Sequence, residues 1–372
     1  MDKRVLAIGA IIIVLLAGVA IWLVSQPKPK EKLVIYTYDY FFGLTGEELE
    51  TQEIYQLIFG RFEEKYGVDI EVKFFDGARN ILLAAVTEKK AGARTADLLI
   101  GLDNIVIQEA KREGILEKIN VSLLENFSKI RSDLVEAFDP EYYGIPYDFG
   151  PIAFVYDSKR ISIENLTFED FVEKDWDSLL VVESPVTSTT GISFLLWQIT
   201  LYEKVLKKDW KTWWQTVKDD IIVTESWGDA YFAYFLDESK NRPIVVSYLT
   251  SPVYHWYYDN TSRYKAMLTY YNDTWYAWAQ IQGIAIVKDS PMKDIAYKFI
   301  DWLLSDEVQS LVALNDIMLP ANVHALNNLP EGVINAMGYN LDDIVLLNSF
   351  VTTNEIYNNI ETWLDEWESI FT

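Results

Sequence analysis

Short apolar runs alternate with amphipathic helical stretches along most of the chain, and this alternation constrains the fold more than any other feature. The runs are aliphatic or β-branched without interruption, as expected of strands covered on both faces in a parallel sheet. They lie at residues 33–36, 98–100, 152–156, 179–182, 221–223, 244–246 and 284–287. Between them, apolar side chains recur at helical spacing, as at 54–66, 295–304 and 356–367. Strands followed by helices, repeatedly, predict an α/β architecture.

The N-terminus carries a separate signal. Residues 5–24 contain no charged or polar side chain, and as a helix they would cross a hydrocarbon layer of about 30 Å. Lys3 and Arg4 precede this run, which favours an N-terminus inside and the remaining chain outside. We therefore expect residues 1–24 to be a membrane anchor at the cell surface and residues 25–32 to be a tether. A cleaved signal segment, which would leave a periplasmic protein, is the alternative.

Composition excludes several kinds of function. The 372 residues include no cysteine and only two histidines, so we expect no thiolate chemistry, metal centre or cofactor. Lys and Arg number 32 against 56 Asp and Glu, and the resulting net charge of −24 opposes nucleic-acid binding. The sequence has no nucleophile-elbow or zinc-hydrolase motif, so we expect no enzyme. A chain of this length predicts two domains.

Candidate binding residues follow the predicted strands, because ligands of open α/β sheets bind beyond the carboxyl ends of strands. These residues are aromatic, acidic or hydroxyl-bearing, together with a glycine and a proline; they are Tyr38, Asp39, Asp76, Gly77, Ser188, Thr189, Trp227, Tyr248, Thr250, Ser251, Pro252 and Tyr254. Aromatic faces attract organic cations, and Asp39 or Asp76 would complement such a charge. Hydroxyl groups before a helix suit a phosphate. Core packing, helix capping and turn formation are the structural alternatives.

The motifs containing these residues, taken in order, resemble those of the thiamine-binding proteins of bacterial ABC importers, a subfamily of type II solute-binding proteins. The resemblance extends from about residue 33 to 370 and rests on the stretches 34–39, 96–104, 146–150, 154–157, 187–191, 227–231 and 247–255.

The resemblance implies two α/β lobes with a ligand cleft between them. We expect lobe one to comprise residues 33–148 and 283–340, and lobe two to comprise residues 149–282. Residues 341–372 would form a helical segment that packs across both lobes. The membrane helix would precede this two-lobed fold.

The resemblance also implies what the protein binds. The ligands would be thiamine, thiamine monophosphate or thiamine diphosphate, and a monomeric protein would deliver them to an ABC permease and its ATPase. Ser188, Thr189 and Gly77 would receive the phosphate, and the aromatic side chains would stack on the rings. One stretch departs from the family: relatives carry Asn-Trp-Met-Tyr-Pro where this chain has residues 315–320, so Asp316 or Ile317 replaces a stacking Trp.

Two other functions stay open from the sequence. The same fold could bind another ligand such as ferric iron, since Tyr257 and Tyr258 stand near His255. A surface hydrolase with paired carboxylates is the other, although no pair among the acidic residues stands out.

Overall fold

The computed structural model describes residues 30–44, 46 and 48–372. The expected membrane anchor at 5–24 therefore lies outside the described residues, as does most of the tether. Within the described part of the chain, no helix combines the length and the apolar character needed to cross a membrane.

Every predicted apolar run overlaps a strand. The strands are β1 Lys32–Tyr38, β2 Asp69–Phe75, β3 Leu98–Asp103, β4 Ile145–Asp157, β5 Leu180–Glu183, β6 Ile222–Thr224, β7 Ile244–Tyr248, β8 Tyr264–Met267, β9 Thr269–Tyr271, β10 Thr274–Ala277, β11 Ala279–Ile286, β12 Leu319–Pro320 and β13 Ile344–Leu346.

The three predicted helical stripes are confirmed as well. The helices are α2 Glu53–Tyr55, α3 Arg61–Tyr66, α4 Ala78–Lys90, α5 Ile107–Arg112, α6 Ser132–Phe138, α7 Glu169–Glu173, α8 Thr189–Thr200, α9 Lys211–Val217, α10 Ser251–Tyr257, α11 Lys293–Leu303, α12 Asp306–Gln309, α13 Val312–Asn315, α14 Val323–Asn327, α15 Glu331–Met337 and α16 Thr353–Phe371. A π-helical stretch, Gln56–Gly60, joins α2 to α3.

The main sheet has the strand order β2-β1-β3-β11-β4-β7-β5-β6, and β8 and β12 also pair with β4. Strands β1, β2 and β3 run parallel, and so do β5, β6 and β7. Strands β4 and β11 run antiparallel to their neighbours, so the expectation of a parallel sheet holds only within each end of it. The antiparallel pairs occur where the chain passes between the two groups of parallel strands.

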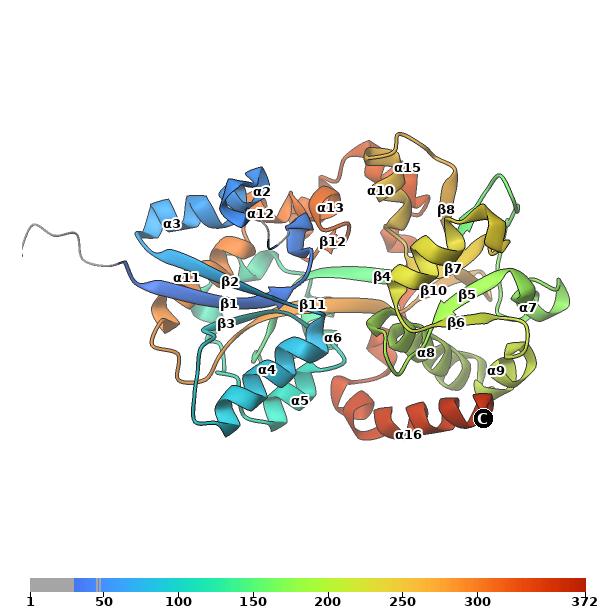
Figure 1. Cartoon of the computed structure of the whole chain (residues 1–372), viewed down its shortest axis with the longest axis horizontal. Coiled ribbons are helices and arrows are strands. Elements are labelled where there is room, and N and C mark those ends of the chain that lie inside the picture. The colour runs from blue at the N-terminus through green and yellow to red at the C-terminus, as the bar shows by residue number, and fades with distance from the viewer. Residues whose placement is uncertain (1–29, 45, 47) are drawn as a thin grey trace, which may run out of the picture.

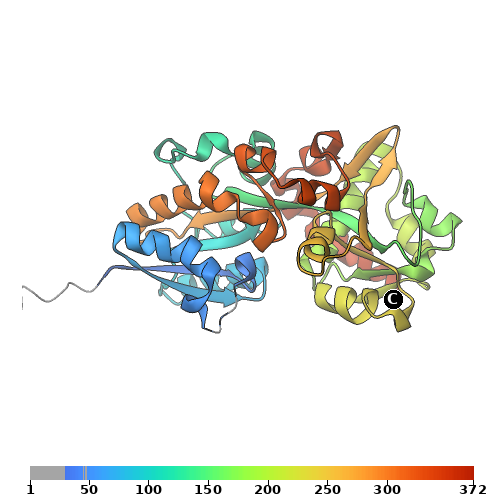
Figure 2. The same ribbon diagram turned by 90° about the horizontal axis from the view of Figure 1, so that it is seen from above.

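Strand β4 joins these two groups. Its first half, 145–151, pairs with β11, and its second half, 152–156, pairs with β7. We call the group of β1, β2, β3, β11 and the first half of β4 lobe one, and the group of β5, β6, β7, β8 and the second half of β4 lobe two. Figures 1 and 2 show helices gathered around each lobe, with β4 running between them. The residue boundaries expected for the lobes stay a prediction.

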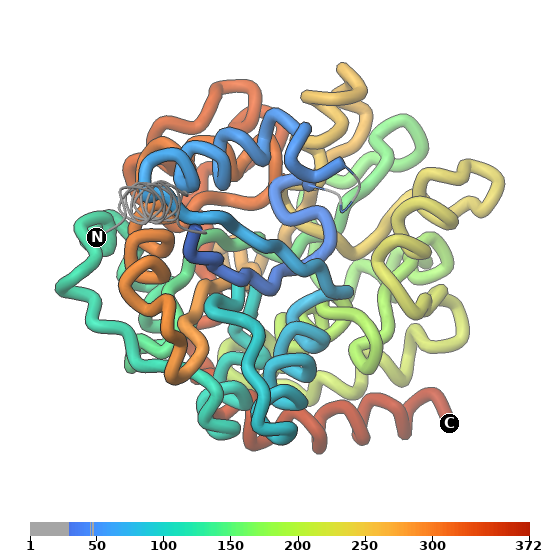
Figure 3. The backbone as a smooth tube through the Cα atoms, turned by 60° about the vertical axis from the view of Figure 1, so that its left-hand side comes forward, coloured from blue at the N-terminus to red at the C-terminus, as the bar shows by residue number. Residues whose placement is uncertain are grey.

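The C-terminal helix α16 touches both lobes. It contacts α5 in lobe one and α9 in lobe two, and Figure 3 shows it along the underside of the molecule. On the lobe-one side, the Arg112 guanidinium donates to Asn354 Oδ1 at 2.8 Å. On the lobe-two side, the buried rings of Trp367 and Trp214 lie 5.6 Å apart, edge to face.

Candidate functional site

Four of the candidate residues lie together at the edge of lobe one. Tyr38 ends β1 and is paired in register with Phe75, the last residue of the parallel strand β2. Asp39 and Asp76 directly follow this pair, and both are exposed. Gly77 then precedes α4 with a φ of 86°, a conformation that favours glycine.

A second glycine sets the position of the Tyr38 ring. Gly101 in β3 has a φ of 92°, and a Cβ built on it would lie 2.3 Å from Tyr38 Cδ1. The ring therefore packs directly on the β3 backbone, which only glycine permits. This contact directs the Tyr38 hydroxyl toward residues of the crossing strand β4.

The remaining candidates lie at the carboxyl ends of the parallel strands of lobe two. Ser188 caps α8, and its Oγ accepts a long hydrogen bond from the Gly191 N–H at 3.4 Å. Thr189 is the first residue of that helix, and Trp227 follows β6. Tyr248 ends β7, and the segment 250–254 enters α10.

Hydrogen bonds join these segments to one another. The Trp227 Nε1–H donates to Ser247 Oγ at 2.9 Å, and Ser247 Oγ lies 2.8 Å from Ser251 Oγ. The Trp227 ring stacks on Tyr231, with centroids 4.9 Å apart. Trp227 is thus held on its edge and on one face, while its side chain remains only half-buried.

The entrance to α10 supplies both polar and apolar groups. The Thr250 hydroxyl is buried and has no hydrogen-bond partner among the described residues. Pro252 is buried, whereas the Tyr254 side chain is 44% exposed. The ring centroids of Tyr254 and Tyr258 lie 5.0 Å apart. The Tyr258 hydroxyl donates to the Leu314 carbonyl of α13 at 3.0 Å, and this bond links the end of α10 to the side of lobe one.

Tyr248 connects the lobe-two candidates to β4 and β11. The Tyr248 hydroxyl donates to Gln280 Oε1 in β11 at 2.6 Å and lies 3.3 Å from Thr190 Oγ1. Gly150 in β4 lies between Tyr248 and Met318, both within 2.8 Å of a Cβ built there. No hydrogen bond connects Asp39 or Asp76 to lobe two in the part of the chain described.

A cluster of polar side chains that were not among the predicted binding residues lies beside Tyr38. The Tyr38 hydroxyl donates to Asp316 Oδ2 at 2.8 Å and lies 3.2 Å from the Tyr147 hydroxyl. Tyr147 in turn donates to Gln282 Oε1 at 2.8 Å. Asp148 in β4 is 0% exposed and hydrogen-bonds with the carboxyl of Asp316 when one of the two is protonated.

Burial controls the protonation of these carboxyl groups. It raises the pKa of Asp148 well above its usual range, and the charge of Asp316 raises it further. Burial also raises the pKa of Asp316 to about 6, although the hydrogen bonds from Asp148, Tyr38 and the Phe42 N–H act to lower it. Asp103, at the end of β3, has a pKa raised to about 6 by burial.

A sequence signal for this cluster existed. Asp148 interrupts a strand whose 13 residues are all buried, and a carboxyl group in such a run requires a partner or a proton. Asp316 lies in the stretch that departs from the family. What the sequence could not show is that these two residues, far apart in the chain, are in contact.

The ferric-iron alternative gains no support from His255. Its Nε2 lies 3.0 Å from the Tyr231 hydroxyl, and its Nδ1 lies 2.7 Å from Asp259 Oδ2. Both ring nitrogens are therefore engaged in the protein interior. A metal between His255, Tyr257 and Tyr258 would require these bonds to break.

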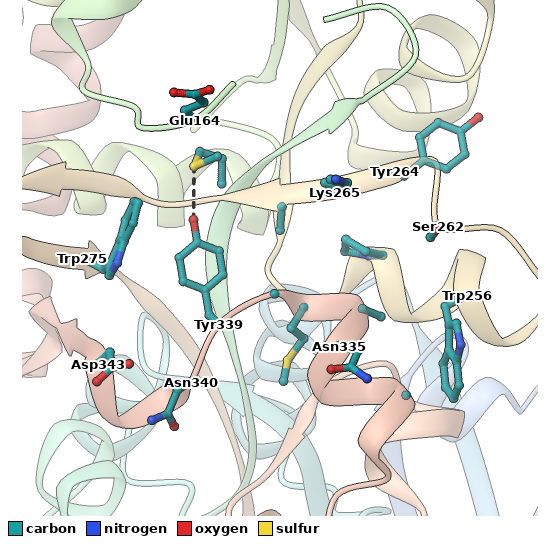
Figure 4. Close-up of a pocket in the computed structure, with 17 residues that line it drawn as sticks. Glu164, Trp256, Ser262, Tyr264, Lys265, Trp275, Asn335, Tyr339, Asn340 and Asp343 are labelled. Carbon is teal, nitrogen blue, oxygen red and sulfur yellow. Dashed lines mark hydrogen bonds between the residues drawn. The ribbon is translucent and has the colours of Figure 1, made fainter. Parts of the chain in front are cut away.

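A cavity of about 520 Å³ lies away from these strand ends (Figure 4). It is bounded by α10, β8 and α15, and the Tyr339 hydroxyl donates to the Met267 sulfur at 3.2 Å on its wall. Of the candidate binding residues it includes only Pro252. The candidate site is therefore defined by the strand ends and not by this cavity.

Comparison with known proteins identifies the family. The profile of the bacterial extracellular solute-binding proteins matches residues 46–310. A thiamine-binding periplasmic protein of Brucella abortus biovar 1 (strain 9-941) is 28% identical over 358 residues, which is 93% of this chain and 94% of the relative. A protein of the same name from Escherichia coli (strain K12) is 26% identical and covers 91% of this chain and 93% of its own length.

A solved structure, of a periplasmic thiamin binding protein, matches with a TM-score of 0.70 at 24% identity, over 92% of this chain and 97% of that chain. This likeness confirms the predicted α/β fold of a type II solute-binding protein. Together with the profile match, it shows that the chain belongs to the family of bacterial extracellular solute-binding proteins.

Proposed function

We propose that this protein is the extracellular substrate-binding component of an ABC importer and that it captures thiamine or its phosphates. The observation that carries the proposal is that curated relatives named as thiamine-binding periplasmic proteins align over more than nine-tenths of the chain. Proteins of this family bind solutes and are not enzymes, in agreement with the expectation of no catalysis.

The candidate residues have the chemistry that thiamine requires. Tyr38, Trp227 and Tyr248 present aromatic rings at the strand ends, and such rings attract a cationic heterocycle. The exposed carboxyl groups of Asp39 and Asp76 lie next to Tyr38 and favour the same charge. Tyr254 adds an exposed ring at the start of α10.

A phosphate group would bind at the start of α8. This helix has 12 residues, and Ser188 and Thr189 place two hydroxyl groups at its N-terminus, where free backbone N–H groups favour an anion. Gly77, which precedes α4 at the edge of lobe one, has no side chain to hinder a phosphate, and its own N–H donates to the Phe75 carbonyl at 2.9 Å. Thiamine monophosphate and thiamine diphosphate would therefore gain contacts that thiamine lacks.

Delivery to a membrane permease is part of this proposal. Ligand would bind between lobe one, at 33–148 and 283–340, and lobe two, at 149–282, and a permease with its ATPase would recognise the closed form. The protein would act as a monomer outside the membrane, held there by residues 5–24 or released into the periplasm after their cleavage.

Two substitutions test the proposed binding site by calorimetry with the three thiamine forms. Trp227→Ala should weaken all three by about tenfold, because a stacking face is lost. Ser188→Ala should selectively weaken the two phosphates, whereas Ser188→Thr, which keeps the hydroxyl, should retain them. An equal loss for all three forms in Ser188→Ala would contradict the phosphate site.

A further inference from the structure

Asp148 is a fully buried carboxyl group that faces the carboxyl of Asp316, and no cation is among the groups that interact with it. Neither oxygen of Asp148 accepts a hydrogen bond of normal geometry from the described residues. Its polar neighbours are the carboxyl of Asp316 and the backbone N–H of Gln282.

The groups around this pair leave its charge uncompensated. Tyr38 from β1, Tyr147 from β4 and Tyr248 from β7 are the other titratable groups that interact with Asp148. Burial raises the pKa of all three, so they stay neutral between pH 5 and 8. Two carboxyl groups in contact with no cation cannot both be ionised at low cost. One of them therefore holds a proton at neutral pH.

Burial decides which carboxyl group holds the proton. Asp148 is fully buried, and its pKa is the more strongly raised of the two. Asp316 is half-buried and already receives hydrogen bonds from the Tyr38 hydroxyl and the Phe42 N–H, which stabilise its ionised form. At neutral pH the pair thus carries one negative charge, on Asp316, with protonated Asp148 behind it.

We propose that Asp316 is the residue that selects a positively charged ligand in this chain, and that Asp148 positions the Asp316 carboxylate by donating a hydrogen bond to it. The inference rests on the proposed function, because it takes the ligand of the Tyr38 side of the site to be an organic cation. It deepens that function by assigning the charge recognition to a residue of the stretch 315–320. A ligand with a cationic ring or a protonated amine would meet the anionic charge of Asp316 beside the ring of Tyr38, in addition to the exposed carboxyl groups of Asp39 and Asp76.

The test measures thiamine affinity by calorimetry from pH 5 to 8. Affinity of the wild-type protein should fall about tenfold between pH 7.5 and pH 5, as Asp316, with its pKa of about 6, takes up a proton. Asp316→Asn should bind thiamine at least about tenfold more weakly at pH 7.5 and should lose this pH dependence. Asp365→Asn, at an exposed position of α16, should match the wild type at every pH.

The role of Asp148 has its own readout. Asp148→Asn retains an N–H donor for Asp316 and should keep both the affinity and the midpoint of the pH profile. Asp148→Ala removes the donor that lowers the pKa of Asp316, so the midpoint should shift to higher pH. If Asp148→Ala leaves the midpoint unchanged, Asp148 is not a positioning residue.

The outcomes separate this inference from the proposed function. If the wild-type protein binds no thiamine form at any pH, the proposed function fails and this inference fails with it. If the wild-type protein binds thiamine and Asp316→Asn binds it equally well, only the inference fails. A pH profile that persists in Asp316→Asn would assign the titration to another group such as Asp103 and would also overturn it.

Discussion

At the scale of single residues, the site depends on close packing of rings against backbone. Tyr38 packs on Gly101, and Tyr248 packs on Gly150, so each ring is fixed by a position that has no side chain. The hydroxyl groups of both rings then donate to side-chain oxygens, those of Asp316 and Gln280. Ring position and hydrogen bonding are therefore coupled at both residues.

Replacing Gly101 tests this coupling. Gly101→Ala places a methyl group against the Tyr38 ring and also strains a backbone with positive φ, so unfolding free energy should fall by about 2–4 kcal/mol. Thiamine affinity should fall too, because the ring is displaced. Gly92→Ala is the matched control: its φ is 66° with nothing within 4 Å, and it should cost about 1 kcal/mol without changing affinity. Equal effects of the two variants would contradict the packing account.

The buried carboxyl group of Glu183 should make the free energy of unfolding depend on pH. Its carboxyl group is fully buried without a hydrogen-bond partner among the described residues, and burial raises its pKa well above 4.5. In this pH range the folded protein keeps the Glu183 proton, whereas the unfolded chain loses it. The free energy of unfolding therefore falls as pH rises above about 4.5, by up to about 1.4 kcal/mol per pH unit, until the pH exceeds the pKa of Glu183 in the folded protein.

Glu183→Gln should therefore be more stable than the wild type at pH 7 to 8 and should show a shallower decline from pH 5. Urea unfolding at pH 5, 6, 7 and 8 measures both. Glu361→Gln, on the exposed face of α16, should follow the wild type. If the stability of the wild type rises with pH over this range, and Glu183→Gln shows the same stability as the wild type, Glu183 does not hold a buried proton.

Some of these residues could be predicted from the sequence, and others could not. Residues that end strands were foreseeable, since Tyr38 and Tyr248 follow apolar runs whose ends define a sheet edge. The contact of Asp148 with Asp316 was not, because it depends on β12 pairing with β4 across a long stretch of sequence. Glu183 was equally hidden, since a carboxyl group at a strand end is usually solvated.

At the scale of elements, strand and helix types followed from periodicity, while their pairing directions did not. Apolar runs predict buried strands, but they do not distinguish a parallel strand from β4 or β11, which run antiparallel to their neighbours. The stripe at 54–66 likewise predicted one helix, and the structure interrupts it with a π-helical stretch.

Helix α16 stabilises the arrangement of the two lobes. Lys204 and Lys218 of lobe two contact it through Glu355 and the Ile370 carbonyl, at 2.7 and 2.8 Å. Trp367→Ala should lower the unfolding free energy by about 3–5 kcal/mol, because it opens a cavity against the buried Trp214 ring. Trp363→Ala, at a half-buried position of the same helix, should cost less than half as much. Similar losses in thermal or urea unfolding would show that α16 does not dock through Trp367.

At the scale of the whole molecule, two lobes are connected by β4, by α16 and by the contact of Tyr258 with the Leu314 carbonyl. Candidate residues from both lobes contact the two central strands: Tyr248 donates to Gln280 of β11, and the Tyr38 hydroxyl lies 3.2 Å from that of Tyr147 of β4. The net charge of −24 favours the approach of a cation to this surface. Ligand capture between the lobes is the property that these features support.

Calorimetry of the chain that follows the apolar run at 5–24, with thiamine, thiamine monophosphate and thiamine diphosphate, tests the proposed ligand most directly. We expect saturable binding of at least one form, with one ligand for each protein molecule. We also expect Trp227→Ala to weaken that binding. Absence of heat and of a thermal shift with all three forms would contradict the assignment of thiamine as the ligand.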